Sequence, residues 1–126
     1  MLLACHTLIY SDDAGATRAF FRDVLGFPCV DAGTGDHDWL IFRTGPSELG
    51  VHPTGPLHDG STTPRHHSIS FIVDDLESTM AALRDKGAEF TSGPDDHGYG
   101  IVAMVAVPGA EDVQLYQPRH RTAYGL

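Results

Sequence analysis

The feature that most constrains the fold of this chain is an internal repeat. The segment HTLIYSDDAGATRAFFRDVLGF is echoed later in the chain by HSISFIVDDLESTMAALRDKGAEF. The spacing is the same at both ends, because His6 and His67 are 61 residues apart (67 − 6), as are Gly26 and Gly87 (87 − 26). Solenoid proteins stack several copies of a shorter repeat, whereas this repeat is longer and occurs only twice. The sequence therefore predicts two similar modules within 126 residues.

Each copy has the pattern of a strand followed by a helix. An apolar run (TLIY or SISFIV) suits a buried strand, and an Asp-Asp pair then supplies N-cap side chains. Apolar residues at helical spacing follow, and a glycine ends the helix. Three short strand-like stretches complete each half: PCVDAG, DWLIFRT and SELGVHP, then AEFTSG, YGIVAMVAV and DVQLYQP. We therefore expect an α+β fold in a single domain, 1–126, with βαβββ modules at about 1–56 and 66–120 and a linker at about 54–65.

The composition of the chain argues against nucleic acid and membranes as binding partners. A net charge of −9 with scattered Lys and Arg argues against a surface that contacts nucleic-acid phosphates. No apolar run approaches the length of a membrane span. The two cysteines, Cys5 and Cys29, make no disulfide framework, so we expect reduced thiols and a cytoplasmic location. The expected partner is a small molecule, with no role for nucleic acid or membrane.

Nearly the whole chain resembles the vicinal oxygen chelate superfamily, which includes glyoxalase I, extradiol dioxygenases and the fosfomycin- and bleomycin-resistance proteins. The likeness is carried by HTLIYSDDAGATRAFFRDVLGF, VDDLESTMAALRDKGAEF and GYGIVAMVAVPGAEDVQLYQP. It implies that each half curls into a half-barrel, that a curved mixed sheet encloses a cup, and that two chains form a homodimer. Its metal-using members imply a divalent cation, Fe, Mn, Ni or Zn, as the candidate cofactor.

Carried over to this chain, the family's metal positions match only in part. His6 directly precedes TLIYS, as the family's first-strand ligand does. On the last strand the position usually held by an acid is Gln114, a conditional ligand whose neutral amide cannot act as a general base. Leu49 takes the equivalent position in the first half, and leucine cannot bind a metal. This departure weakens the expectation of glyoxalase chemistry.

The second histidine position has two interpretations. Counting back from the Val-Asp pair by the family's spacing reaches Ser68, whereas matching the helix ends of the repeat pairs His67 with His6. On the first interpretation, which the strand alignment favours, Ser68 faces the cup, His66 shares its face from the rim and His67 faces away. A β-bulge near the strand start would turn His67 inward. His67 is therefore a second conditional ligand.

Several ring side chains are candidates for contact with an organic ligand. Trp39 begins an expected strand, Tyr99 follows His97 on a glycine-rich turn, and Tyr116 shares the face of the conditional metal position. Simple packing, or an ordinary turn for Tyr99, explains each of them as well. The candidate ligand-binding residues are Trp39, Phe42, Ser68, Tyr99 and Tyr116.

Two hypotheses follow for function. The first is a metal-free protein that binds a small molecule on this scaffold, and the missing carboxylate ligand favours it. The second is a metal-dependent lyase, isomerase or extradiol-type dioxygenase, in which His6 and a second histidine, with Gln114, would hold the cation. A metal bound through His6 discriminates between them.

Overall fold

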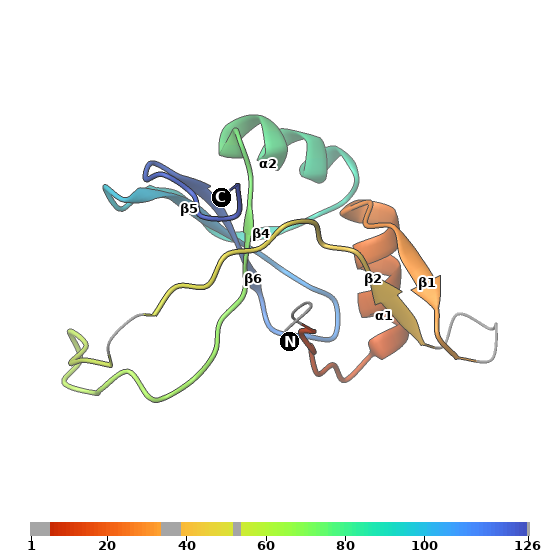
Figure 1. Cartoon of the computed structure of the whole chain (residues 1–126), viewed down its shortest axis with the longest axis horizontal. Coiled ribbons are helices and arrows are strands. Elements are labelled where there is room, and N and C mark those ends of the chain that lie inside the picture. Colours follow the sequence, from red (N-terminus) through yellow and green to blue (C-terminus); the bar gives the residue numbers. More distant parts are fainter. Residues whose placement is uncertain (1–5, 34–38, 52–53, 126) are drawn as a thin grey trace.

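The fold is known from a computed structural model that describes residues 6–33, 39–51 and 54–125. The elements are, in chain order, α1 (Ala14–Ala19), the π-helical η1 (Phe20–Val24), β1 (Cys29–Asp31), β2 (Leu40–Phe42), β3 (Ser70–Ile72), α2 (Leu76–Asp85), β4 (Phe90–Asp96), β5 (Gly100–Val105) and β6 (Val113–Pro118) (Figure 1). Helices occur together with both parallel and antiparallel strand pairs, so the predicted α+β class with a mixed sheet is confirmed. In these three ranges no helix has the length and apolar character needed to cross a membrane.

The second half of the chain has the predicted βαβββ order. Its four strands form one sheet in the order β3-β6-β5-β4. β3 runs parallel to β6, whereas β6 and β5, and β5 and β4, are antiparallel. The helix between the first two strands begins after Asp75, whose carboxylate accepts a hydrogen bond of 3.0 Å from the Ser78 N–H. The last strand of this half therefore lies between its first and third strands.

The first half forms fewer strands than its sequence predicts. β1 and β2 make a separate, two-stranded antiparallel sheet, and the described residues 6–11 and 43–51 form no strand. After β2 the chain runs away from this hairpin (Figure 1). Glu48 in that stretch accepts a hydrogen bond of 2.6 Å from the Ala123 N–H of the C-terminal tail. The exact division into two modules stays a prediction.

Both helical segments pack on the same face of the four-stranded sheet. The buried core contains Phe20 and Phe21 of η1 together with Leu76 and Met80 of α2, and its strand residues include Val105. The ring of Phe21 lies 5.7 Å from that of Phe42, 6.2 Å from that of Phe27 and 6.4 Å from that of Phe71, measured between centroids. The first-half helix therefore shares one core with the second-half sheet.

The start of α1 is fixed by the turn between β5 and β6. The Asp12 N–H and the Ser11 hydroxyl donate to the Gly109 carbonyl over 2.7 and 2.9 Å. Gly109 has φ = +80°, and a Cβ built on it would lie 2.6 Å from Ser11 Oγ. Only glycine fits such a close approach with a left-handed backbone. This contact joins residues 11–13, at the start of α1, to the turn between β5 and β6.

Candidate functional site

The sheet face that the helices leave uncovered carries the last-strand candidates. Gln114 and Tyr116 are two residues apart on β6, so their side chains share a face, while Val113 and Leu115 are buried in the core on the other face. The parallel register places Ser70 of β3 opposite Gln114, and its hydroxyl donates to Gln114 Oε1 over 2.6 Å. This uncovered face is therefore polar at Gln114 and aromatic at Tyr116.

The residues predicted as metal ligands do not fit a divalent cation. His6 and His67 are both exposed, and the amide oxygen of Gln114 accepts the Ser70 hydrogen bond. Within residues 6–33, 39–51 and 54–125, no three His, Cys, Asp or Glu side chains gather in a group suited to a metal. The predicted ligands are therefore not gathered around one metal position in the part of the chain that the structure describes.

A row of ring side chains lies at the rim of the uncovered face. His97 stacks on Tyr99 with ring centroids 5.8 Å apart and an interplanar angle of 17°. Tyr99 meets Tyr116 edge to face at 6.0 Å, and Tyr116 lies 5.8 Å from His120. Tyr99 keeps 58% of its surface exposed, so the row offers open ring surface to a ligand. We call these four residues the aromatic row.

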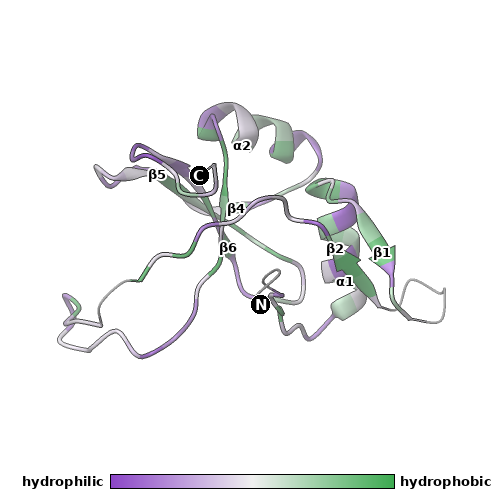
Figure 2. Ribbon diagram, in the orientation of Figure 1, coloured by the Kyte–Doolittle hydropathy of each residue, from purple (hydrophilic) through white to green (hydrophobic). Residues whose placement is uncertain are grey.

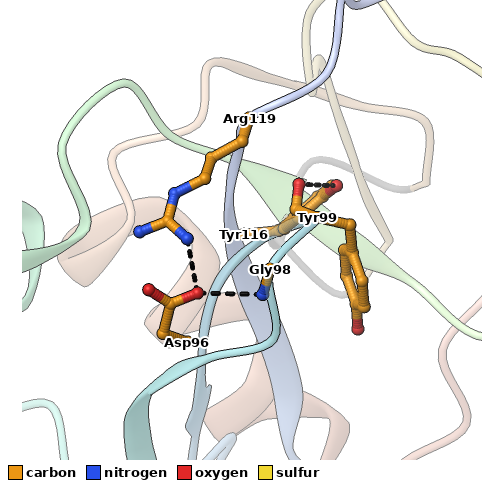
Figure 3. A network of polar contacts seen from close by, with 5 residues as sticks. All are labelled: Asp96, Gly98, Tyr99, Tyr116 and Arg119. Atoms are coloured by element: carbon orange, nitrogen blue, oxygen red, sulfur yellow. Dashed lines mark hydrogen bonds and ion pairs between the residues drawn. The ribbon is translucent and has the colours of Figure 1, made fainter.

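The turn that carries Tyr99 is held by an ion pair (Figure 3). The Arg119 guanidinium donates to the Asp96 carboxylate, which also accepts a hydrogen bond of 2.9 Å from the Gly98 N–H. The Arg119 N–H donates in addition to the Tyr99 carbonyl over 2.9 Å. The Arg119 hydrogen bond, and after it the Gly98 N–H, lower the pKa of Asp96 below its usual value. Arg119 thus links the end of β6 to both sides of the turn.

A carboxylate from the first half contacts the C-terminal tail. Glu48 Oε2 accepts a hydrogen bond of 2.6 Å from the Ala123 N–H. The pKa of Tyr116 is raised first by burial and then by the charges of Tyr99 and Glu48. The stretch after β2 and the tail that follows β6 therefore meet at Glu48 and Ala123.

The other predicted ligand-binding residues lie elsewhere. Trp39 directly precedes β2 and is 53% exposed, whereas Phe42 packs on Phe21 in the core. Ser68 is exposed and lies before β3. Figure 1 shows the β1–β2 hairpin on the opposite side of the molecule from the free end of β5. One chain therefore brings Tyr99 and Tyr116 together but not Trp39, and the assignment of all five stays a prediction.

Two contributors to this face were not singled out from the sequence. Ser70 follows Ser68 by two residues, so the alternation that puts Ser68 toward the cup would have included it. His120 lies in the tail, where no periodicity indicates direction, and its contact with Tyr116 emerges only from the fold. Strand alternation could therefore have predicted Ser70 from the sequence, whereas no sequence pattern could have predicted the position of His120.

An open hollow also lies at the base of the hairpin. It has a volume of about 390 Å³, and its lining residues are Pro28, Cys29, Val30, Ile41, Phe42 and Arg43. The hydropathy colouring shows apolar residues along β2 and most of β1, although Val30 is 64% exposed (Figure 2). The hairpin therefore presents apolar surface that its own chain does not cover.

The chain was compared with protein families, curated proteins and solved structures. A family model described as the Glyoxalase/Bleomycin resistance protein/Dioxygenase superfamily matches residues 4–113. No curated protein matches the chain. Solved structures with the same fold include three that are each similar over most of this chain at low sequence identity. TnmS3, an antibiotic binding protein from Streptomyces sp. CB03234, is 18% identical over 94% of this chain and 99% of its own, with a TM-score of 0.59.

The second structure is a member of the same superfamily from Sphaerobacter thermophilus, 22% identical over 89% of this chain and 93% of its own, with a TM-score of 0.58. The third is lactoylglutathione lyase from Agrobacterium tumefaciens, 19% identical over 88% of this chain and 90% of its own, with a TM-score of 0.57. A binding protein and an enzyme are thus equally similar to this chain, so the likeness establishes fold alone.

Proposed function

The chain belongs to the Glyoxalase/Bleomycin resistance protein/Dioxygenase superfamily, and on that premise we propose that it binds a small organic molecule with a planar aromatic part. The binding surface is the rim of the uncovered sheet face, at Tyr99 and Tyr116. The working form is a homodimer, and binding does not use the metal centre of the family's enzymes.

The observation that carries this proposal is the aromatic row. Four rings from the β4–β5 turn, β6 and the tail stand in sequence with centroid separations of 5.8 to 6.0 Å, and Tyr99 is more than half exposed. Exposed rings held in place by neighbours lose little conformational freedom when a ligand stacks on them. The ion pair of Arg119 with Asp96 supports this role by fixing the turn beneath Tyr99.

The polar part of the face supports recognition without a metal. Ser70 and Gln114 form a hydrogen-bonded pair, and each retains capacity for a further hydrogen bond. A ligand whose ring stacks at Tyr116 would place a polar substituent near this pair, because Gln114 is two residues away on the same strand. A mostly apolar contact with a few fixed polar groups is typical of small-molecule sites.

A thermal-shift screen of planar aromatic compounds followed by calorimetric titration tests the proposal. We expect a ligand that raises the melting temperature and whose affinity falls roughly twofold to tenfold in Tyr99→Ala, since one aromatic contact contributes about 0.5–1.5 kcal/mol. Tyr10→Ala is the matched control, because Tyr10 is 86% exposed and lies outside the aromatic row. Equal loss of affinity in both variants would contradict the site.

Elemental analysis tests the metal-free part of the proposal. Near-stoichiometric Fe, Mn, Ni or Zn in untagged protein, lost in His6→Ala, would overturn it in favour of a metal-dependent lyase, isomerase or dioxygenase. We expect no such metal in the native protein, even after it is soaked with these ions and then desalted.

A further inference from the structure

Tyr99 has a glycine on each side, and the two glycines meet different structural needs. Gly98 has φ = +81°, a left-handed conformation that favours glycine, and a Cβ built on it would meet no atom within 4 Å. Gly100 begins β5, is buried, and is not among the glycines with positive φ. The backbone conformation at Gly100 therefore does not call for glycine, so the reason for this residue lies in what surrounds it.

The ring of Tyr116 occupies the space that a side chain at residue 100 would need. A Cβ built on Gly100 would overlap Tyr116 Cε2, and it would lie 3.1 Å from Tyr116 Cδ2 and 2.7 Å from the Gln117 carbonyl oxygen. The strand register agrees with this contact, because Gly100 pairs with Pro118, which lies two residues after Tyr116 and on the same face of β6. One edge of the Tyr116 ring therefore lies directly against the Gly100 backbone.

The position of this ring determines the geometry of the aromatic row. Tyr116 meets Tyr99 at an interplanar angle of 63° and lies 5.8 Å from the His120 ring. Its hydroxyl also donates to the Tyr99 carbonyl over 3.4 Å (Figure 3). A side chain at residue 100 would push the ring out of this position, so both ring contacts and the hydrogen bond would change together.

We propose that Gly100 is a positioning residue of the aromatic row, which fixes the orientation of the Tyr116 ring by leaving room for it. Its effect on ligand binding rests on the proposed function, whereas its effect on the ring does not. A planar compound stacked on one tyrosine meets the other edge to face, because the two rings are inclined at 63°. Gly100 therefore helps to select the compounds that fit both rings at once.

Nuclear Overhauser spectroscopy of the native protein tests the contact without any substitution. We expect cross-peaks between the α-protons of Gly100 and the ring protons of Tyr116, because the ring edge lies against this part of the backbone. The α-protons of Gly109 serve as a reference, since the atoms closest to a Cβ there belong to Ser11 and Asp13. Gly100 α-protons without cross-peaks to the Tyr116 ring would overturn the proposal.

A double-mutant cycle tests whether Gly100 acts through the ring. Gly100→Ala should shift the ring resonances of Tyr116 and lower the affinity for the best planar compound by about twofold to tenfold, as Tyr116→Ala does, since each variant removes the same aromatic contact. The double variant should bind no more weakly than Tyr116→Ala alone, because the ring through which Gly100 acts is then absent. Losses of affinity that add in the double variant would contradict the positioning role.

Gly109→Ala is the matched control for loss of stability. Gly109 lies in the turn at the other end of the β5–β6 pair, and a Cβ there would also be crowded, with Ser11 Oγ at 2.6 Å. This variant should be less stable than the native protein but should keep the Tyr116 ring resonances and the ligand affinity unchanged. Equal losses of affinity in Gly109→Ala and Gly100→Ala would show a general structural effect and would overturn the proposal.

The same measurements separate this inference from the proposed function. If the cross-peaks of Gly100 with Tyr116 are present but no planar compound binds, the positioning of the ring stands and the proposed function is refuted. If Tyr99→Ala weakens binding but Gly100→Ala leaves both the ring resonances and the affinity unchanged, the proposed function stands and this inference is refuted.

Discussion

Arg119 and Asp96 form the contact on which the position of the Tyr99 turn depends. Their charges lie at the surface, so the pair contributes little to overall stability but orients the turn through two hydrogen bonds from Arg119, one from its guanidinium and one from its backbone N–H. Arg22 and Asp23 make a comparable exposed pair far from the aromatic row, with an Nε to Oδ1 distance of 2.7 Å. Comparing variants of the two pairs therefore shows whether ligand binding depends on the ion pair beside Tyr99 or is equally sensitive to the loss of any exposed ion pair.

Arg119→Ala should weaken ligand binding severalfold, whereas Arg22→Ala should leave it unchanged. Titration of both variants with one ligand checks this difference. If the two variants bind alike, the ion pair has no part in ordering the site.

The same pair predicts a pH dependence whose sign follows from Asp96. Its pKa is lower in the folded protein than in the unfolded chain, where a carboxyl has a value of about 3.9. The stabilisation is therefore fully present above that value and is lost as the pH falls through the folded pKa. Native and Arg119→Ala proteins should differ slightly in melting temperature at pH 7, and the difference should disappear as the pH falls through the lowered pKa of Asp96. A difference that grows on acidification would contradict the assignment.

The elements of the second half could be predicted from the sequence, and those of the first half only in part. The Asp75 N-cap, the apolar stripe of α2 and the alternation of β6 act within short segments, so local pattern was enough for them. The strands expected at 7–10 and 47–53 depend on partners, and their described residues form no strand; within the second stretch Glu48 instead accepts a hydrogen bond from the Ala123 N–H. Of the candidate site, alternation predicted Tyr116 on the open face, but no local signal predicted that Trp39 would lie so far from it.

Gly109, in the turn between β5 and β6, contacts the residues that begin α1. A comparison with Gly26 measures how much this contact contributes to stability. Both have positive φ, +80° and +73°, but a Cβ would meet other atoms only at Gly109, with Ser11 Oγ at 2.6 Å. Gly26→Ala should cost about 1 kcal/mol from backbone strain alone. Gly109→Ala should cost clearly more, because it also displaces the start of α1. Denaturant titration of both variants checks the order, and equal costs would mean that this contact is dispensable.

At the level of the whole molecule, the first half of the chain leaves apolar side chains uncovered. Leu49 and Val51 are 93% and 94% exposed, and the described residues 43–51 form no strand. The proposed working form is a homodimer, and a native state that exists only as a dimer is stabilised by mass action. The melting temperature of the native protein should therefore rise with protein concentration. A native melting temperature independent of concentration would contradict the proposed homodimer.

Nuclear magnetic resonance can map where a ligand binds on this chain. Backbone amide shifts of the labelled protein would be followed during titration with the best compound from the thermal-shift screen. We expect the largest changes on the β4–β5 turn around Tyr99, on β6 around Tyr116 and on Ser70. Changes confined to the hollow of the β1–β2 hairpin, or to His6 and His67, would show that the ligand binds elsewhere and would refute the proposed binding surface.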